Sequence, residues 1–121
     1  MKKIVLTVDD SRTILKMLSM TLNEAGYETV QAADGLEGLE ALEFCTPDVI
    51  VTDINMPRLD GFGFIEGVRS DDKYRAIPIL VLTTESDSDK KDRARRAGAT
   101  GWIVKPFDPS KLVDAIGRVI A

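Results

Sequence analysis

Five short apolar runs limit the possible folds of this chain most strongly, because a segment of helical character follows each of them. The expected strands are Lys3–Val8, Tyr27–Gln31, Val49–Asp53, Ile79–Leu82 and Thr100–Lys105. Regular alternation of strands and helices predicts a parallel sheet covered by helices on both faces. The fold class is therefore α/β, with a doubly wound sheet and five helices.

The helical segments show apolar residues at helical spacing. The first carries one apolar stripe and ends near Gly26, and the last begins at Pro109, which suits a first helical position. Those between them are expected at Asp34–Phe44, around Phe64–Val68 and at Asp87–Ala97.

The composition of the strands predicts their order. The first, third and fourth runs are almost entirely apolar, as central strands buried on both sides must be, whereas Tyr27–Gln31 alternates with polar residues and is expected at an edge. The order 2-1-3-4-5 satisfies these demands and places the switch point of a flavodoxin-like sheet between strands one and three.

Composition limits the class of protein. The 121 residues suit one domain spanning 1–121, no apolar stretch is long enough to cross a membrane, and no signal peptide is apparent. A net charge of −4 argues against a nucleic-acid-binding domain. The single cysteine, Cys45, allows no internal disulfide and fits a cytoplasmic protein. Because the chain has no histidine, a bound metal would need oxygen ligands, which favours Mg²⁺, Ca²⁺ or Mn²⁺.

Reactive residues stand where four of the five strands end. Asp9 and Asp10 follow the first, Asp53 ends the third, Thr83 follows the fourth and Lys105 ends the fifth. The carboxyl ends of parallel strands share one edge, which is where open α/β sheets bind ligands. We therefore expect these side chains to converge.

Three carboxylates brought together repel one another unless a cation intervenes, and Mg²⁺ is the natural cation for such ligands. Asp53 is then a candidate nucleophile that could hold a phosphoryl group, with Lys105 and Thr83 neutralising and hydrogen-bonding the phosphoryl oxygens. Each residue also has a simpler interpretation. Asp9 and Asp10 could cap the first helix, Lys105 could be a solvated lysine, and Thr83 an ordinary strand residue.

Four motifs, "VDDS", "TDINMPRLDG", "LTTES" and "GWIVKPF", together resemble response-regulator receiver domains, and in particular single-domain chemotaxis regulators of the CheY type. The resemblance covers essentially the whole chain. It implies that Asp53 is the phosphoacceptor, that Asp9, Asp10, Asp53 and the backbone carbonyl of Asn55 bind Mg²⁺, and that Thr83 is a switch hydroxyl. It also implies that Lys105 pairs with phosphoryl oxygens and precedes a cis peptide bond to Pro106.

Three further residues have roles by the same resemblance. Asn55 and Glu85 occupy positions that tune hydrolysis of the acyl phosphate. Trp102 stands where the family usually has a switch tyrosine or phenylalanine, so a switch role and ordinary packing are both open for it.

The fourth helix offers the core little apolar surface beyond Ala94 and Ala97, which predicts weak anchoring and availability for switching. Its charges could simply form a solvated face. The alternative is that the fourth helix, the fifth strand and the last helix bind a partner, with the residues Lys90, Lys91, Arg95 and Trp102.

The expected function is that of a non-enzymatic switch, a monomer that takes phosphate from a CheA-like histidine kinase and then binds a protein target. In chemotaxis that target is the flagellar motor switch. A phosphate sink or relay module is the alternative.

An aspartate-nucleophile phosphatase is disfavoured because Asn55 replaces the second aspartate of a D-x-D pattern. A flavin-binding module is disfavoured because Asp9 and Asp10 would repel the FMN phosphate. A DNA-binding output would need a further domain after Ala121.

Overall fold

The computed structural model describes residues 2–120 and confirms the flavodoxin-like fold. Five parallel strands form one sheet in the order β2-β1-β3-β4-β5. The strands are β1 (Ile4–Val8), β2 (Glu28–Ala32), β3 (Val49–Thr52), β4 (Ile79–Thr83) and β5 (Gly101–Val104).

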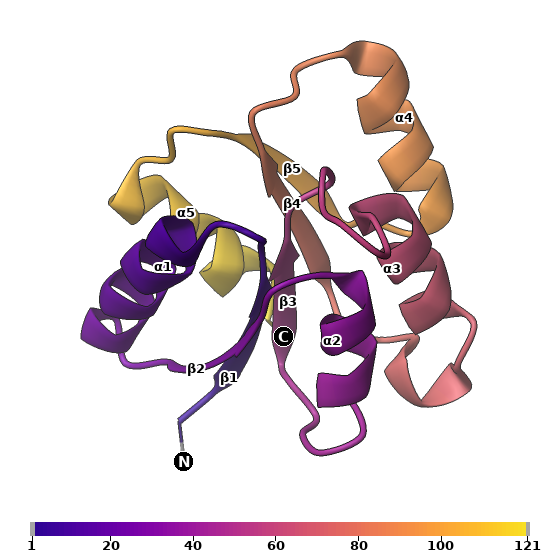
Figure 1. The fold of residues 1–121 in the computed structure, drawn as a ribbon. Helices are drawn as coiled ribbons and strands as arrows, with labels where there is room; N and C mark the ends of the chain where they lie inside the picture. Colours follow the sequence, from indigo (N-terminus) through magenta and orange to yellow (C-terminus); the bar gives the residue numbers. More distant parts are fainter. Residues whose placement is uncertain (1, 121) are drawn as a thin grey trace.

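Helices cover both faces of the sheet (Figure 1). On one face lie α1 (Arg12–Glu24) and α5 (Pro109–Val119), and on the other lie α2 (Gly35–Ala41), α3 (Gly61–Arg69) and α4 (Ser88–Ala97). A short 3₁₀ helix, η1 (Asp72–Tyr74), follows α3 and was not expected from the sequence.

The central strands separate two apolar cores. Successive residues of a strand point to opposite faces, so Ile50 packs in the core beneath α2, α3 and α4, while Val51 packs in the core beneath α1 and α5. Every residue of β3 and β4 is buried, as expected for interior strands. The β2 strand is only partly covered, which confirms its place at an edge.

Most boundaries match the expected ones to within one residue, and the second helix differs most. Asp34 is its N-cap rather than its first residue, and α2 ends at Ala41 instead of Phe44. The last turn tightens, since the Glu43 N–H donates to the Glu40 carbonyl at 3.0 Å. The Phe44 side chain is 87% exposed, so burial provides no force to extend the helix to that residue.

Two of the expected strands end one residue earlier than predicted. Asp53 lies just beyond β3, and Lys105 just beyond β5, because the strand pairing stops at Thr52 and Val104. Among the residues from 2 to 120, no helix combines the length and the apolar character needed to cross a membrane.

Candidate functional site

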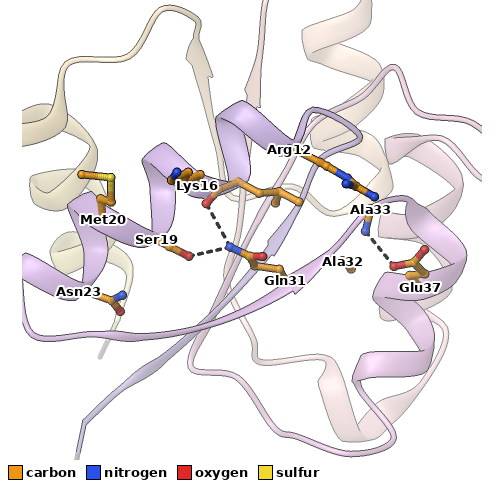
Figure 2. A pocket seen from close by; sticks show the side chains of 10 residues that line it. Arg12, Lys16, Ser19, Met20, Asn23, Gln31, Ala32, Ala33 and Glu37 are labelled. Carbon is orange, nitrogen blue, oxygen red and sulfur yellow. Dashed lines mark hydrogen bonds between the residues drawn. The ribbon is translucent and has the colours of Figure 1, made fainter.

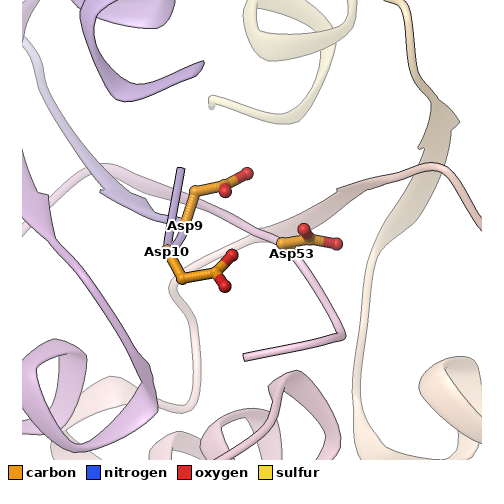
Figure 3. A group of neighbouring side chains, drawn as sticks. All are labelled: Asp9, Asp10 and Asp53. Atoms are coloured by element: carbon orange, nitrogen blue, oxygen red, sulfur yellow. The ribbon is translucent and has the colours of Figure 1, made fainter. Parts of the chain in front are cut away.

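Three carboxylates meet at the carboxyl edge of the sheet. Val8 of β1 and Thr52 of β3 are partners in the parallel register, so the residues that follow them, Asp9 and Asp53, are brought side by side. An oxygen of each, together with one of Asp10, lies within 4.8 Å of the other two (Figure 3). Asp9 and Asp53 are buried and Asp10 is exposed, so the cluster opens to solvent on one side.

Lys105 joins two of these carboxylates. Its ammonium donates hydrogen bonds to Asp9 Oδ2 at 2.7 Å and to Asp53 Oδ2 at 3.0 Å. Its side chain is only 11% exposed, so both interactions lie in a poorly hydrated environment. The peptide bond from Lys105 to Pro106 is cis, as expected.

Burial and charge shift the pKa values at this site. Loss of hydration raises the pKa of Asp9; hydrogen bonds from Lys105 and from the Ser11 N–H oppose that change. Burial alone would lower the pKa of Lys105, but its hydrogen bonds to Asp9 and Asp53 and their charges outweigh that effect and raise it. Lys105 therefore stays protonated, whereas Asp9 is a crowded carboxylate that a further cation would stabilise.

The backbone fixes how these carboxylates point. Asp9 Oδ1 accepts from the Ser11 N–H at 2.9 Å, and Asp53 Oδ1 accepts from the Ile54 N–H at 2.7 Å. The N-cap of α1 is Ser11, whose hydroxyl accepts from the Ile14 N–H. Asp9 and Asp10 therefore do not cap α1, which weakens the simpler interpretation of this pair.

The chemistry of the cluster fits a hard divalent cation. Its donors are carboxylate oxygens, and three carboxylates face one ammonium, so negative charge is in excess. Asp10 provides the most accessible carboxylate of the three. Asn55 lies two residues beyond Asp53 on the same loop, exposed to solvent, where its carbonyl could complete such a site.

Glu85 connects the loops around this edge. Its Oε1 accepts from Asn55 Nδ2 at 3.1 Å and pairs with Lys90 Nζ at 3.0 Å, and these partners lower its pKa, Lys90 more than Asn55. Its backbone N–H donates to the hydroxyl of the buried Thr83 at 3.3 Å. Its carbonyl accepts from the indole N–H of Trp102 at 3.1 Å.

The expected partner residues gather around the α4–β5 side. Lys91, Arg95 and Trp102 line a small cavity of about 120 Å³ together with Ala94, which is the one buried residue of α4. Lys90 does not line this cavity, and its ammonium instead forms an ion pair with Glu85. Little apolar burial holds α4, as its sequence predicted.

Sequence reasoning missed two arginines and an aromatic ring that anchor α4 in place of apolar burial. Arg69 of α3 donates from Nε and Nη2 to the carbonyl of Gly98 at the end of α4, at 3.1 and 3.0 Å. The guanidinium of Arg93 lies 4.1 Å from the centre of the Phe62 ring. Both pairs join residues far apart in sequence, so periodicity carries no signal of them.

A larger hollow lies away from the carboxylates, between α1 and the edge strand β2 (Figure 2). This groove, about 530 Å³ in volume, is crossed by Gln31, whose side-chain amide donates to the Ser19 hydroxyl at 2.7 Å. None of the expected catalytic or metal-binding residues lines it. The volume of a cavity therefore does not identify the place where the expected catalytic residues meet.

Comparison with known proteins agrees with this geometry. The family model described as the response regulator receiver domain matches residues 5–117. The chain is 38% identical over 118 residues to the chemotaxis protein CheY1 of Helicobacter pylori, an alignment that covers 96% of this chain and 95% of that protein. It is 42% identical to the transcriptional regulatory protein PdtaR of Mycobacterium tuberculosis, covering 97% of this chain but 56% of that protein.

Solved structures extend the likeness. The chemotaxis protein CheY4 of Vibrio cholerae superposes with a TM-score of 0.94 at 47% identity, covering 98% of this chain and 99% of that one. The receiver domain of the sensor histidine kinase PA1611 of Pseudomonas aeruginosa, solved with a magnesium ion coordinated in its active site cleft, gives 0.92 at 26% identity, with 99% and 98% covered. From the family match, the sheet order and the convergence of acidic residues, this chain belongs to the response-regulator receiver domains, the phosphoacceptor modules of two-component signalling.

Proposed function

We propose that Asp53 accepts a phosphoryl group from a histidine kinase in a Mg²⁺-dependent reaction, and that the phosphorylated chain then binds a target protein. The observation that carries this proposal is the meeting of Asp9, Asp10 and Asp53 at one edge, with Lys105 hydrogen-bonded to two of them. It combines a nucleophile with a place for a divalent cation and a fixed positive charge.

Each residue has a chemical role in this proposal. An oxygen of Asp53 attacks phosphorus, the new O–P bond forms, and the bond from phosphorus to the donor imidazole nitrogen breaks. Lys105, already 3.0 Å from Asp53, pairs with a phosphoryl oxygen, and the Thr83 hydroxyl donates to another. Asp9, Asp10, Asp53 and the Asn55 carbonyl would hold Mg²⁺, which would neutralise charge on the transferred group.

Asn55 and Glu85 belong to the reverse step, in which water hydrolyses the acyl phosphate. Their side chains are hydrogen-bonded to each other at 3.1 Å and join the loops that follow β3 and β4. Because Lys90 also binds Glu85, movement of α4 changes this pair. We propose that these two side chains set how long the phosphoryl group persists.

The proposed setting is chemotaxis in the cytoplasm, with the chain acting as a monomer and the flagellar motor switch as target. The similarity to CheY1 of Helicobacter pylori and CheY4 of Vibrio cholerae over nearly their full lengths supports this choice. The second candidate is a phosphate sink or relay module, which the likeness to a receiver domain of a sensor histidine kinase favours. In both cases the output is binding rather than turnover of an external substrate.

The first experiment tests the phosphoacceptor. Incubation with acetyl phosphate and Mg²⁺, followed by mass spectrometry, is expected to add one phosphoryl group to the wild-type chain and none to Asp53→Ala. EDTA is the matched control and abolishes the addition. Equal phosphorylation of the two chains, or none in the wild type, contradicts the proposal. Sustained hydrolysis of an external phosphate ester would revive the phosphatase alternative.

The second experiment tests the output surface. With beryllofluoride and Mg²⁺ as phosphoryl mimic, a motor switch protein should retain the wild-type chain and retain Lys91→Ala and Arg95→Ala more weakly, while both variants still accept phosphate. Arg75→Ala is the control, because the exposed Arg75 side chain pairs with Asp72 of η1 and not with α4. Unchanged retention across this face would exclude it as the partner surface, and no retention of any chain favours the sink or relay.

A further inference from the structure

The loop from β3 to α3 contains a strained turn at Arg58. This residue has a φ of 65° and is the one non-glycine residue with positive φ in the described chain from 2 to 120. The Leu59 N–H donates to the Pro57 carbonyl at 2.7 Å, which closes a γ-turn around Arg58. Such turns with positive φ are rare, and a residue other than glycine keeps this conformation only where neighbouring contacts impose it.

An ion pair imposes it here. Arg58 Nε donates to Asp34 Oδ2 at 2.7 Å, and Arg58 Nη2 lies 3.6 Å from Glu37 Oε2. The Asp34 side chain is 6% exposed and its other oxygen, Oδ1, accepts from the Glu37 N–H as the N-cap of α2. The arginine therefore satisfies a buried carboxylate that is fixed at the start of α2.

Backbone contacts beside Arg58 join the same two loops. The Gly35 N–H donates to the Leu59 carbonyl at 3.0 Å. A Cβ on Gly35 would lie 2.5 Å from that carbonyl oxygen, so the approach requires glycine. The turn at Arg58 is thus docked against the start of α2 by one side-chain pair and one backbone hydrogen bond.

The other end of the loop is equally fixed. The Ile54 N–H donates to Asp53 Oδ1 and the Ile54 carbonyl accepts from the Gly61 N–H at 2.8 Å. Residues 55–57 are therefore a short span between two anchors, and Asn55 itself is exposed. Its side chain donates to Glu85 at 3.1 Å, and the two anchors restrain its backbone.

We infer that Arg58 is a positioning residue for the divalent cation: its ion pair with Asp34 holds the β3–α3 loop, and with it the Asn55 carbonyl that the proposed function assigns to Mg²⁺. This inference rests on the proposed function. It assigns to Arg58 and Asp34, neither of which touches the cluster, control over Mg²⁺ affinity. The side-chain pair acts through the loop backbone.

Titration of Mg²⁺ by calorimetry tests this, together with the rate of phosphorylation by acetyl phosphate as a function of Mg²⁺. Arg58→Ala and Asp34→Asn are expected to weaken Mg²⁺ binding about tenfold, the lower end of the effect of residues behind metal ligands. At saturating Mg²⁺ both variants should phosphorylate at the wild-type rate. Asparagine at 34 keeps the N-cap of α2, so that variant removes the ion pair alone.

Two variants separate positioning from general stability. Arg58→Lys keeps the charge and should restore part of the affinity. Arg58→Gly removes the backbone strain but also the ion pair. It should therefore bind Mg²⁺ as weakly as Arg58→Ala, while its unfolding free energy in EDTA should be at least that of Arg58→Ala. Arg75→Ala is the matched control and should bind like the wild type.

Wild-type Mg²⁺ affinity in Arg58→Ala and Asp34→Asn would overturn the inference and leave the proposed function intact. Wild-type affinity in Arg58→Gly would also overturn it, since backbone strain and not the ion pair would then govern binding. If the wild-type chain binds no Mg²⁺, or Asp10→Asn binds it unchanged, the proposed metal site fails and the inference fails with it.

Discussion

At the scale of single residues, the site depends on the mostly buried ammonium of Lys105, which lies between two buried carboxylates. Lys105 donates to Asp9 and Asp53 from a side chain that is 11% exposed. The attraction compensates for hydration that all three groups lose, and removing one partner leaves charge unpaired. Lys105 is therefore expected to contribute to folding stability in addition to its proposed role in phosphoryl transfer.

Replacement of Lys105 by methionine tests both contributions. In EDTA at neutral pH the variant should lose about 3 kcal/mol of unfolding free energy, because Asp9 and Asp53 remain buried without their cation. Mg²⁺ should stabilise the variant more than the wild type, and acetyl phosphate should label it more slowly. Urea denaturation with and without Mg²⁺ measures the first two effects. Equal stability of the two chains in EDTA would contradict this view of the pair.

Asp34 allows a test of pH dependence away from the metal site. Its hydrogen bond from Arg58, followed in weight by that from the Glu37 N–H, holds its pKa below the ordinary value of 3.8. A lowered pKa stabilises the fold at pH values above the ordinary one, and this contribution is lost as pH falls through the lowered pKa.

Asp34→Asn should therefore be less stable than the wild type by about 1 kcal/mol at neutral pH, with little change down to about pH 5, because Arg58 is half exposed and its ion pair is partly screened. The difference should shrink below about pH 4. Urea denaturation in EDTA at a series of pH values measures it. A difference that grows on acidification has the wrong sign for this explanation.

At the scale of elements, α4 is held by polar contacts rather than by apolar burial. Ala94 is its only buried residue, while Arg69 binds the carbonyl of Gly98 and Arg93 lies over Phe62. Its first turn is tied by Lys90 to Glu85 and hence to Asn55. Hydrogen bonds and charges can exchange partners with little loss of packing, which suits the proposed role of α4 in binding a partner after phosphorylation.

Arg69→Met should loosen the end of α4. The substitution keeps much of the apolar stem but removes the hydrogen bonds that Arg69 donates to the carbonyls of Gly98, Tyr74 and Arg75, at an expected cost of about 2 kcal/mol in unfolding free energy. The substitution should increase the rate of amide exchange in residues 94–99 more than in α1. Arg75→Ala serves as control, and unchanged exchange in α4 would show that Arg69 does not anchor it.

At the scale of the whole molecule, four loops from four strands contribute to one site, so binding there is linked to global unfolding. A ligand that binds only the folded chain raises its unfolding free energy, by about 3 kcal/mol at one hundred times its dissociation constant. Through Glu85, polar contacts also join α4 to Asn55, two residues beyond Asp53.

Beryllofluoride with Mg²⁺ should therefore raise the melting temperature of the wild-type chain and leave Asp53→Ala unchanged. Differential scanning calorimetry with Mg²⁺ alone, and with fluoride but no beryllium, separates metal binding from binding of the phosphoryl mimic. Trp102 is the only tryptophan, so its fluorescence in the same samples reports whether the indole leaves the Glu85 carbonyl. Equal melting shifts in both chains would place the ligand elsewhere than Asp53.

The sequence alone determined the sheet order and the strand ends at which chemistry gathers. Burial on both faces demands continuous apolar runs, which separate the central strands β1, β3 and β4 from the edge strand β2. Parallel strands share their carboxyl ends, so Asp9, Asp53 and Lys105 were expected together. These are consequences of local pattern and topology, and both can be read from residue order.

Only the tertiary structure decided the contacts between loops. The ion pair of Arg58 with Asp34, the hydrogen bonds from Arg69 to Gly98 and the capping of α1 by Ser11 rather than Asp9 depend on distances that no periodicity encodes. The early end of α2 has the same origin, since the exposed Phe44 contributes no burial to extend it. Loop contacts are set by how whole elements pack, and a few hydrogen bonds then choose among conformations that the sequence permits equally.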